Sequence, residues 1–501
     1  MPLRCLTVAA LLWLAIAAGQ LTIGPDGPVR PKPQPGESAR DEPAVYRLTI
    51  APGEKPATPL AYRFGVPAAD REPGNSVPLY YRALVMWLDQ PSEGRRQAEQ
   101  KFSDWSDLPI DKLPCEQMRE TLARFEFIVR ELEQASRREF TDWDWNWEST
   151  TGGEFFRYRL TEIQESRSLA RLLRAKALLE IAEGRYEDAA TTIRTSYALA
   201  RAVSQPPSVI SGHVGLAIGS ITDHTVVDWI AQPGSPNLYW AMMTLPDPLI
   251  TLRPALEFEL TVHERFAPWL KNVEQDRSPQ IVWRDRLTAT TAELDDVTDD
   301  LFGRFDFEGE WPAKLFPVLA ALRSFPAAKQ ALRERGFDAA AIEAMPVGKV
   351  IALRQRQVDE RISQELLKTA FLPTAEAIEH ARAMEVTLHD YWGVHSSLVS
   401  EEPFPLLALL TPAVQQILYA ESRKMVRSAG LKTVEAIRLH AAATGALPAS
   451  LDEINVVPVP DDPLTGEPFS YRVDGKTAVL DVAIDPRFSQ INWRFELMMA
   501  D

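Results

Sequence analysis

Residues 158–203 decide the fold, and they read YRLTEIQESRSLARLLRAKALLEI, AEGR and YEDAATTIRTSYALARAV in order. The first and third pieces space their apolar residues as a helix with one buried face does. The four residues between them, 182–185, leave room only for a short turn, which makes the two helices antiparallel. The stretch therefore predicts a helical hairpin, a unit that stacks into arrays.

The small residues of this hairpin resemble one degenerate tetratricopeptide unit. The likeness rests on Leu173, Ala177, Gly184, Tyr186 and Ala189. Lys176 and Glu180 stand where that repeat usually has apolar residues, and no second clear copy follows at the repeat's period of about 34 residues. We therefore expect an array of antiparallel helical hairpins, tetratricopeptide-like in part, and not a true tandem repeat.

Helical periodicity continues on both sides of the hairpin. Apolar residues recur three and four apart along residues 113–138, and a third helix is predicted from residue 207 to residue 231. Ser211, Gly215 and Gly219 lie on one face of that helix and allow a neighbouring helix to approach closely. The remaining predicted helices cover residues 238–245, 254–273, 315–335, 350–371, 375–391 and 411–443.

The pattern changes near residue 446, where Pro, Asp and β-branched residues become frequent. Residues 469–473 and 476–482 flank Asp474-Gly475, and this dipeptide between two apolar runs predicts a two-residue hairpin turn. Residues 492–498 provide a third strand. The predicted fold is mainly α, with a small C-terminal β-hairpin module.

These changes in pattern divide the chain into six parts. Arg4 precedes an apolar run over residues 6–18 that ends in small residues, the pattern of a secretory signal peptide. A Pro-rich tether follows, and alternation over residues 46–50 predicts a short strand after it. The predicted parts are residues 1–19 as signal peptide, 20–44 as Pro-rich tether, 45–274 as N-terminal helical array, 275–310 as acidic linker, 311–445 as second helical region and 446–501 as a small strand module.

The signal peptide predicts an exported protein, periplasmic or extracellular, with no membrane span once the signal is removed. Cys115 is then the one cysteine left, so the chain can form no intrachain disulfide and its stability has to come from packing. Acidic residues number 70 against 54 Lys and Arg, a formal net charge of -16. Because nucleic-acid binding requires clustered Lys and Arg, we expect no nucleic-acid partner.

Signatures of familiar enzyme chemistry are missing from the sequence. It contains no G-x-S-x-G or S-x-x-K nucleophile motif, no P-loop and no G-x-G-x-x-G motif. His263-Glu264 is not followed by the second histidine of a zinc-protease helix. Glu385 and His389 lie four residues apart, a spacing that more often gives a surface ion pair or hydrogen bond than a metal site. We expect no catalytic residues, no metal and no cofactor.

One local pattern points to a ligand, because residues 141–148 read TDWDWNWE. In an extended segment, alternation puts three tryptophans on one side and acids on the other. An exposed row of indoles beside acids can stack sugar rings and hydrogen-bond their hydroxyls. The candidate ligand-binding residues are Asp142, Trp143, Asp144, Trp145, Trp147 and Glu148. In the alternative, the tryptophans fill the helical array and have a structural role only.

A set of separate stretches carries a family resemblance. The most specific stretch is residues 236–241, which read PNLYWA. The others are residues 73–75, 142–143, 164, 168–172, 182–185, 245–246 and 252–253. Together they resemble a family of uncharacterised exported helical proteins of planctomycete bacteria over about residues 45–265. No activity is established for that family, so the resemblance implies export and a helical fold only.

The segment after the long C-terminal helix has a likeness of its own. Residues 444–448 read TGALP, residues 451–453 read LDE, and residues 462–471 read DPLTGEPFSY. With the helix before them, they look like the C-terminal portion of the major pseudopilin of type II secretion. The prepilin peptidase site, the apolar N-terminal helix and the calcium-binding loop of pseudopilins are missing here. The resemblance therefore implies a shared shape for this module, and neither pilus assembly nor calcium binding.

Functions from different classes remain open. The first is an exported non-catalytic helical-array protein, a protein-binding or envelope-scaffold component whose partner is an envelope or secreted protein, because stacked hairpins commonly serve as recognition surfaces. The second is a carbohydrate-binding protein or hydrolase that uses residues 142–148 on a glycan. The third is a spacer in the cell envelope. Tryptophans that line a cleft would favour a ligand, and tryptophans packed against helices would favour a structural role.

Overall fold

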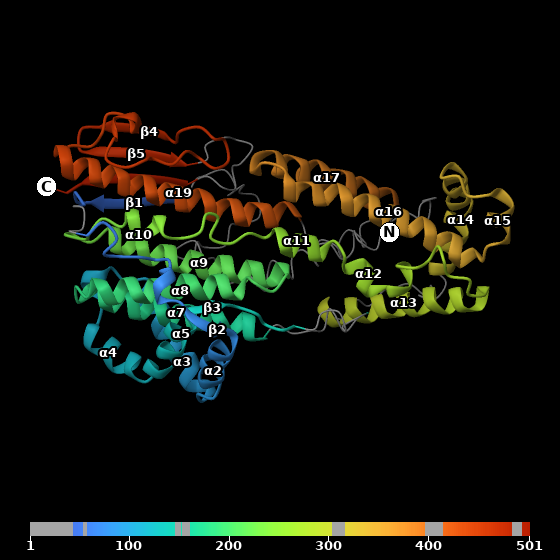
Figure 1. Ribbon diagram of the computed structural model, residues 1–501, viewed down its shortest axis with the longest axis horizontal. Helices are drawn as coiled ribbons and strands as arrows, with labels where there is room; N and C mark the ends of the chain where they lie inside the picture. The colour runs from blue at the N-terminus through green and yellow to red at the C-terminus, as the bar shows by residue number, and fades with distance from the viewer. Residues whose placement is uncertain are drawn as a thin grey trace, which may run out of the picture. The chain divides into compact units, whose positions relative to one another are not determined.

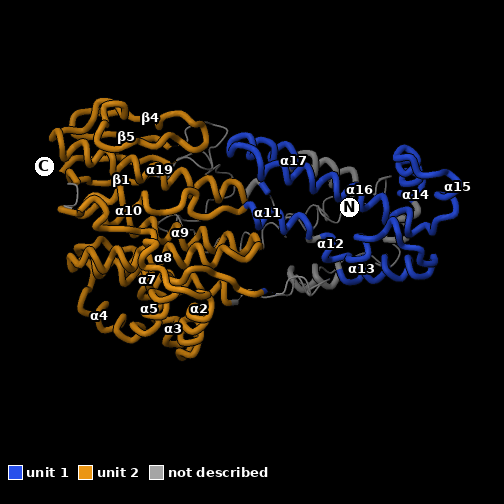
Figure 2. The backbone as a smooth tube through the Cα atoms, viewed as in Figure 1, with its two compact units in different colours: residues 1–23, 145–159, 253–416 blue, residues 24–144, 160–252, 417–501 orange. Residues whose placement is uncertain are grey.

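The computed structural model describes residues 44–53, 58–145, 152, 161–302, 316–395, 414–482 and 493–500. They form a mainly helical protein with a small sheet, as the sequence predicts. The chain folds into two compact units (Figure 2). We name residues 24–144, 160–252 and 417–501 the sheet unit, and residues 1–23, 145–159 and 253–416 the helical unit. The predicted signal peptide lies outside the described residues, and so does the tether apart from Ala44.

Three long helices lie at the centre of the sheet unit (Figure 1): α7 (Thr161–Ala182), α8 (Tyr186–Val203) and α9 (Val209–Ile230). Each packs against the other two through buried apolar side chains. Between α7 and α8, Gly184 has a φ of 70° and the Arg185 N–H donates to the Glu180 carbonyl oxygen at 2.8 Å. Glycine favours this way of ending a helix, so the turn forms where the sequence predicts it.

Shorter helices precede this group: α2 (Val77–Leu88), α3 (Ser92–Ser106), α4 (Cys115–Ala123) and α5 (Glu126–Ser136). The helical periodicity predicted over residues 113–138 is divided between two helices, because the chain breaks between α4 and α5. Phe125 has φ -107° and ψ 6°, outside the helical range, and its ring lies 5.6 Å from that of Trp87 and 5.9 Å from that of Phe102. The break lets Phe125 enter this aromatic cluster.

A four-stranded sheet joins the two ends of the described chain. Its order is β1-β6-β5-β4, from β1 (Ala44–Ile50), β4 (Ser470–Asp474), β5 (Thr477–Val482) and β6 (Trp493–Met499). β1 runs parallel to β6, with Ala44 opposite Trp493 and Ile50 opposite Met499. The strand module predicted at residues 446–501 is therefore completed by a strand from the other end of the chain. Local sequence patterns do not reveal such a pairing.

The β4–β5 hairpin forms as predicted, with its turn one residue later. Asp474 pairs with Thr477, so Gly475 and Lys476 are the turn residues. Gly475 has a φ of 58°, the left-handed conformation that a two-residue turn requires and that glycine adopts without strain.

The helix α19 (Val414–Thr444) crosses one face of this sheet, close to the predicted bounds of 411–443 (Figure 1). At Gly430, a Cβ atom would lie 3.0 Å from the Phe495 ring and 3.4 Å from Val482, so glycine permits the close approach of helix and sheet. The short helix α10 (Tyr239–Met243) and the two-stranded parallel pair β2 (Glu72–Asn75) and β3 (Arg138–Phe140) complete the sheet unit.

The helical unit contains α11 (Arg253–Glu259), α12 (Val262–Phe266), α13 (Gln280–Phe302), α14 (Phe316–Glu334), α15 (Ala339–Ala344), α16 (Val347–Leu367) and α17 (Thr374–His395). The acidic linker predicted at residues 275–310 is mostly the helix α13. Trp283 near its start is buried in an apolar cluster and meets the Trp269 ring edge-on at 5.9 Å. The predicted linker acids beyond Phe302 lie outside the described residues.

Candidate functional site

The candidate ligand-binding segment begins directly after β3, where Asn75 holds it. The Asn75 side-chain NH2 donates to the Asp142 carbonyl oxygen at 2.6 Å, and the Asp142 N–H donates to Asn75 Oδ1 at 2.9 Å. The hydroxyls of Ser76 and Thr141, 2.8 Å apart, extend this contact. Two stretches that carry the family resemblance, residues 73–75 and 142–143, therefore belong to one hydrogen-bonded structure.

Trp143 points into the helices and is buried. Its indole N–H donates to the Ala202 carbonyl oxygen at 2.8 Å, at the end of α8. The Tyr81 ring of α2 meets the indole edge-on, with centroids 5.5 Å apart. These contacts account for the burial of Trp143 through the packing of helices.

The extended alternation predicted for the segment stops at Asp144, which has a φ of 49°. Asp142 Oδ1 accepts a hydrogen bond from the Asp144 N–H at 2.9 Å, and this local turn explains the left-handed backbone. Asp142 and Asp144 are exposed, Trp145 is half-buried, and Trp147 and Glu148 lie outside the described residues. A ligand-binding role for the six candidates stays a prediction.

The PNLYWA stretch has a structural role, since it fastens the chain after α9 to α19. The Asn237 side-chain NH2 donates to the Glu435 carbonyl oxygen at 2.8 Å, and the Leu238 N–H donates to the Glu435 carboxylate. The Tyr239 hydroxyl donates to the Pro458 carbonyl oxygen at 2.5 Å. The most specific part of the family resemblance thus connects three distant parts of the sheet unit.

Arg438 forms the centre of this connection and is fully buried. Its guanidinium donates to the Ala51 carbonyl oxygen (3.0 Å), to the Ser235 carbonyl oxygen and hydroxyl (2.9 and 2.7 Å) and to the Glu435 carboxylate (2.6 Å). A buried arginine needs this many partners to offset the loss of hydration. The arrangement is well suited to holding segments in place.

A second buried charge cluster lies between α9 and α19. Asp223 accepts hydrogen bonds from the Tyr197 hydroxyl at 2.7 Å and from Lys424 Nζ at 3.1 Å. The Arg427 guanidinium lies over the rings of Tyr46 (5.2 Å) and Trp493 (5.5 Å) and pairs with Asp223 at 3.9 Å. All of these charged side chains are buried, so the cluster links the central helices to the sheet.

The titration of this cluster follows from burial. Burial raises the pKa of Tyr197 well above its usual value, and the neighbouring Asp223 carboxylate adds to the shift. Burial and the nearby Arg427 hold the pKa of His224 well below its usual range. Tyr197 therefore stays protonated and His224 stays neutral near pH 7.

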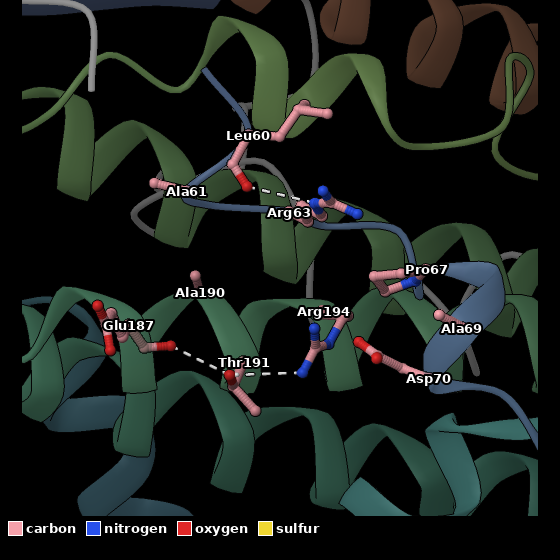
Figure 3. Close-up of a pocket in the computed structure, with 10 residues that line it drawn as sticks. All are labelled: Leu60, Ala61, Arg63, Pro67, Ala69, Asp70, Glu187, Ala190, Thr191 and Arg194. Atoms are coloured by element: carbon pink, nitrogen blue, oxygen red, sulfur yellow. Dashed lines mark hydrogen bonds between the residues drawn. The ribbon is translucent and has the colours of Figure 1, made fainter. Parts of the chain in front are cut away.

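An open pocket lies between α8 and residues 60–70 (Figure 3). Its volume is about 370 Å³, within the range of small-molecule sites. The apolar lining comes from Leu60, Ala61, Pro67, Ala69 and Ala190, and the polar lining comes from Arg63, Asp70, Glu187, Thr191 and Arg194. Arg63 belongs to the overlying segment, and Thr191 and Arg194 belong to α8.

Arg194 is the most unusual group in this pocket. Its Nε is buried with no hydrogen-bond partner among the described residues, and its Nη2 makes a long hydrogen bond of 3.5 Å to the Thr191 hydroxyl. Burial lowers the pKa of Arg194, and Arg137 lowers it further, whereas Asp70 and Glu133 oppose the shift. A lowered pKa means that the surroundings compensate the positive charge incompletely.

Sequence reasoning missed this pocket, although one signal was present. Arg194 and Arg201 lie seven residues apart on a helix whose other inward positions are small or apolar, so both face the same side. Burial lowers the pKa of Arg201 too, and Arg71 adds to that shift. The missing information was the position of residues 60–70, which contain no motif.

The histidines and acids of the described chain do not gather into a metal site. Among the described residues, no group of three or more His, Cys, Asp or Glu side chains could hold a metal ion. The side chains of Glu385 and His389 lie outside the described ones. No helix in the described part of the chain is long and apolar enough to cross a membrane. Comparison of the chain with family models, curated proteins and solved structures found no match.

Proposed function

We propose that the chain is an exported, non-catalytic protein that binds an envelope or secreted protein. One observation carries the proposal: α2 exposes an apolar stripe. Tyr81, Val85 and Leu88 lie three and four residues apart, and 37%, 61% and 39% of their surfaces are exposed. Contiguous apolar surface of this kind marks interaction sites on monomeric proteins.

The neighbouring helix α5 also exposes an aromatic ring, and we include it in the proposed surface. Glu131 of α5 pairs with Arg82 of α2 at 2.8 Å, and Phe127, one turn before Glu131, is 51% exposed. The Arg130 guanidinium lies over the Phe127 ring at 5.2 Å. We name Tyr81, Val85, Leu88 and Phe127 the α2 patch. Aromatic and arginine side chains of this type are frequent anchors in protein interfaces.

The positions of the polar side chains favour binding over catalysis. Arg438, Glu435 and Asp223 hold parts of the fold together, and Trp143 packs against helices. Among the described residues of the 142–148 segment, no specific observation favours the glycan alternative. As part of the proposal, we interpret α7, α8 and α9 as an array of antiparallel hairpins, tetratricopeptide-like in part, because short turns join helices that pack on one another.

The test is capture of a partner from envelope extract with the immobilised chain, followed by a binding measurement with the purified partner. We expect Val85→Asp to weaken binding about tenfold or more, because it puts a charge at the centre of the α2 patch. Met243→Asp is the matched control, since Met243 is 44% exposed on α10 and lies outside the patch.

Both variants need to keep the helical circular dichroism and the melting temperature of the unchanged chain. Equal binding by Val85→Asp, Met243→Asp and the unchanged chain would remove the α2 patch from the proposal. Failure of the unchanged chain to capture any specific partner would contradict the binding function itself.

A further inference from the structure

We propose that the pocket between residues 60–70 and α8 binds a small organic carboxylate, with Arg194 as its main anchor and Arg63 as its second contact. This site does not depend on the α2 patch. Figure 3 shows Arg63 on the overlying segment, and Thr191 and Arg194 on α8 below it. An oxyanion placed between them would meet guanidinium donors from both walls.

Hydrogen bonds within the described residues use only some of the guanidinium N–H donors of Arg194 and Arg63. Arg194 Nε has no hydrogen-bond partner among the described residues, and its contact to Thr191 is 3.5 Å long. Arg63 donates Nε to the Leu60 carbonyl oxygen at 3.2 Å, which uses one of the five N–H donors of a guanidinium and fixes the side chain at the pocket. Arginine presents its donors as a planar fork that matches a carboxylate in two parallel hydrogen bonds.

The charges that line the pocket are balanced, because Arg63 and Arg194 share it with Asp70 and Glu187. The attraction for an anion therefore comes from the guanidinium N–H donors themselves. Besides burial, Arg137 lowers the pKa of Arg194, whereas the carboxylates of Asp70 and Glu133 raise it. Arg137 itself pairs with the Glu72 carboxylate at 3.4 Å.

The rim of the pocket restricts the charge of the ligand. Asp70 and Glu187 are exposed there, and both carboxylates repel an anion that carries two negative charges more than one that carries a single charge. Leu60, Pro67 and Ala190 supply apolar wall on the inside, which suits a short carbon chain. The carboxylates at the rim and the apolar wall together favour a monocarboxylate over inorganic phosphate.

The test uses propionate as the probe, in calorimetric titration of the full chain at constant ionic strength. Propionamide, which has the same shape without the charge, is the first comparison, and inorganic phosphate is the second. We expect saturable binding of propionate, no binding of propionamide and weaker binding of phosphate. Binding of phosphate that equals or exceeds that of propionate would overturn the ligand class.

Variants assign the binding to the pocket. Arg194→Gln is expected to reduce propionate affinity about tenfold or more, since a charge-assisted pair is lost. Arg194→Lys keeps the charge but loses the fork, and we expect an intermediate loss. Arg96→Gln removes an exposed arginine of α3 (73% exposed side chain) and should leave affinity unchanged.

Melting temperatures separate loss of the site from loss of the fold. If Arg194→Gln unfolds the chain, Arg63→Gln takes its place, because Arg63 is only half-buried and donates its Nε hydrogen bond to the neighbouring Leu60 carbonyl oxygen. Absence of saturable propionate binding to the unchanged chain, or equal affinity in the Arg194→Lys, Arg63→Gln and Arg96→Gln variants, would refute the site.

Discussion

One cluster in the sheet unit and one in the helical unit are built from different kinds of buried side chain. Around α19, the residues that connect distant segments are charged and buried: Asp223, Lys424, Arg427, Glu435 and Arg438. Around α13 and α16, the corresponding cluster is apolar, with Trp283, Leu332 and Val350 fully buried. An apolar cluster tolerates substitutions that keep its volume, whereas a buried charge requires its partners at fixed positions. The two regions should therefore respond very differently to small chemical changes.

The largest effect is expected at Arg438. Arg438→Met keeps much of the side-chain volume but removes its donors and leaves Glu435 as a buried, unpaired carboxylate. We expect a loss of about 3–5 kcal/mol in the free energy of unfolding, measured by urea titration. Adding Glu435→Gln removes the unpaired charge and should recover part of the loss. A cost no greater than that of Arg96→Gln would show that the network contributes nothing to stability.

A smaller effect is expected at Tyr197, where one atom changes. Tyr197→Phe removes the hydroxyl that donates to Asp223 at 2.7 Å and leaves the carboxylate with fewer donors in a buried place. The expected loss is about 1–3 kcal/mol in the same titration. The Tyr239→Phe variant, whose hydroxyl donates to a backbone carbonyl oxygen, provides a neutral comparison and should cost less.

The apolar cluster offers the contrasting case. Trp283→Phe keeps an aromatic ring in the cluster and loses one hydrogen bond, from the indole N–H to the Ser278 carbonyl oxygen at 3.0 Å. We expect a loss of about 1–2 kcal/mol, measured by the unfolding of the helical unit. If Trp283→Phe lowers the free energy of unfolding more than Arg438→Met does, the apolar cluster is not more tolerant of substitution than the buried charge network, and the comparison is wrong.

The smallest expected effect is a pH dependence at His213. Burial, with Arg423 and Arg167 nearby, lowers the pKa of His213 from 6.5 to about 4. The unfolded chain then binds the proton more readily, so stability is full above about pH 6.5 and declines as the pH falls toward 4. His213 is only half-buried, so solvent screens part of this effect. We therefore expect the free energy of unfolding to fall by only about 1 kcal/mol.

The measurement is the urea midpoint between pH 7 and pH 4 for the unchanged chain and for His213→Gln. The variant should show a weaker decline across this range. An identical decline in the two proteins would assign the pH dependence to other groups.

Local patterns in the sequence predicted most elements that local interactions determine. The bounds of α8 and the hairpin of β4 and β5 follow from helical spacing and from Gly475. The break at Phe125 and the helical character of α13 were missed, because both depend on aromatic side chains that pack against distant residues. Periodicity alone does not show which residues a tryptophan or phenylalanine will meet.

The two candidate sites show the same difference between what local sequence patterns reveal and what depends on distant segments. The sequence identified the segment at Asp142 as unusual, and the structure shows Asn75 as its hydrogen-bond partner. The pocket at Arg194 escaped detection, because a segment without a motif covers α8 there. Arg194 and Arg201 on one face of α8 were the available signal, and such a pair does not distinguish a ligand site from an internal ion pair such as that of Glu435 and Arg438.

The parallel pairing of β1 with β6 has a consequence for the newly made chain. Arg47 and Glu496 form an ion pair across 449 positions of sequence. At about 5–20 residues per second, a ribosome needs about 20–90 seconds to travel that distance. The strand β1 therefore waits for that time before its neighbour exists, and the sheet can close only after β6 has been made.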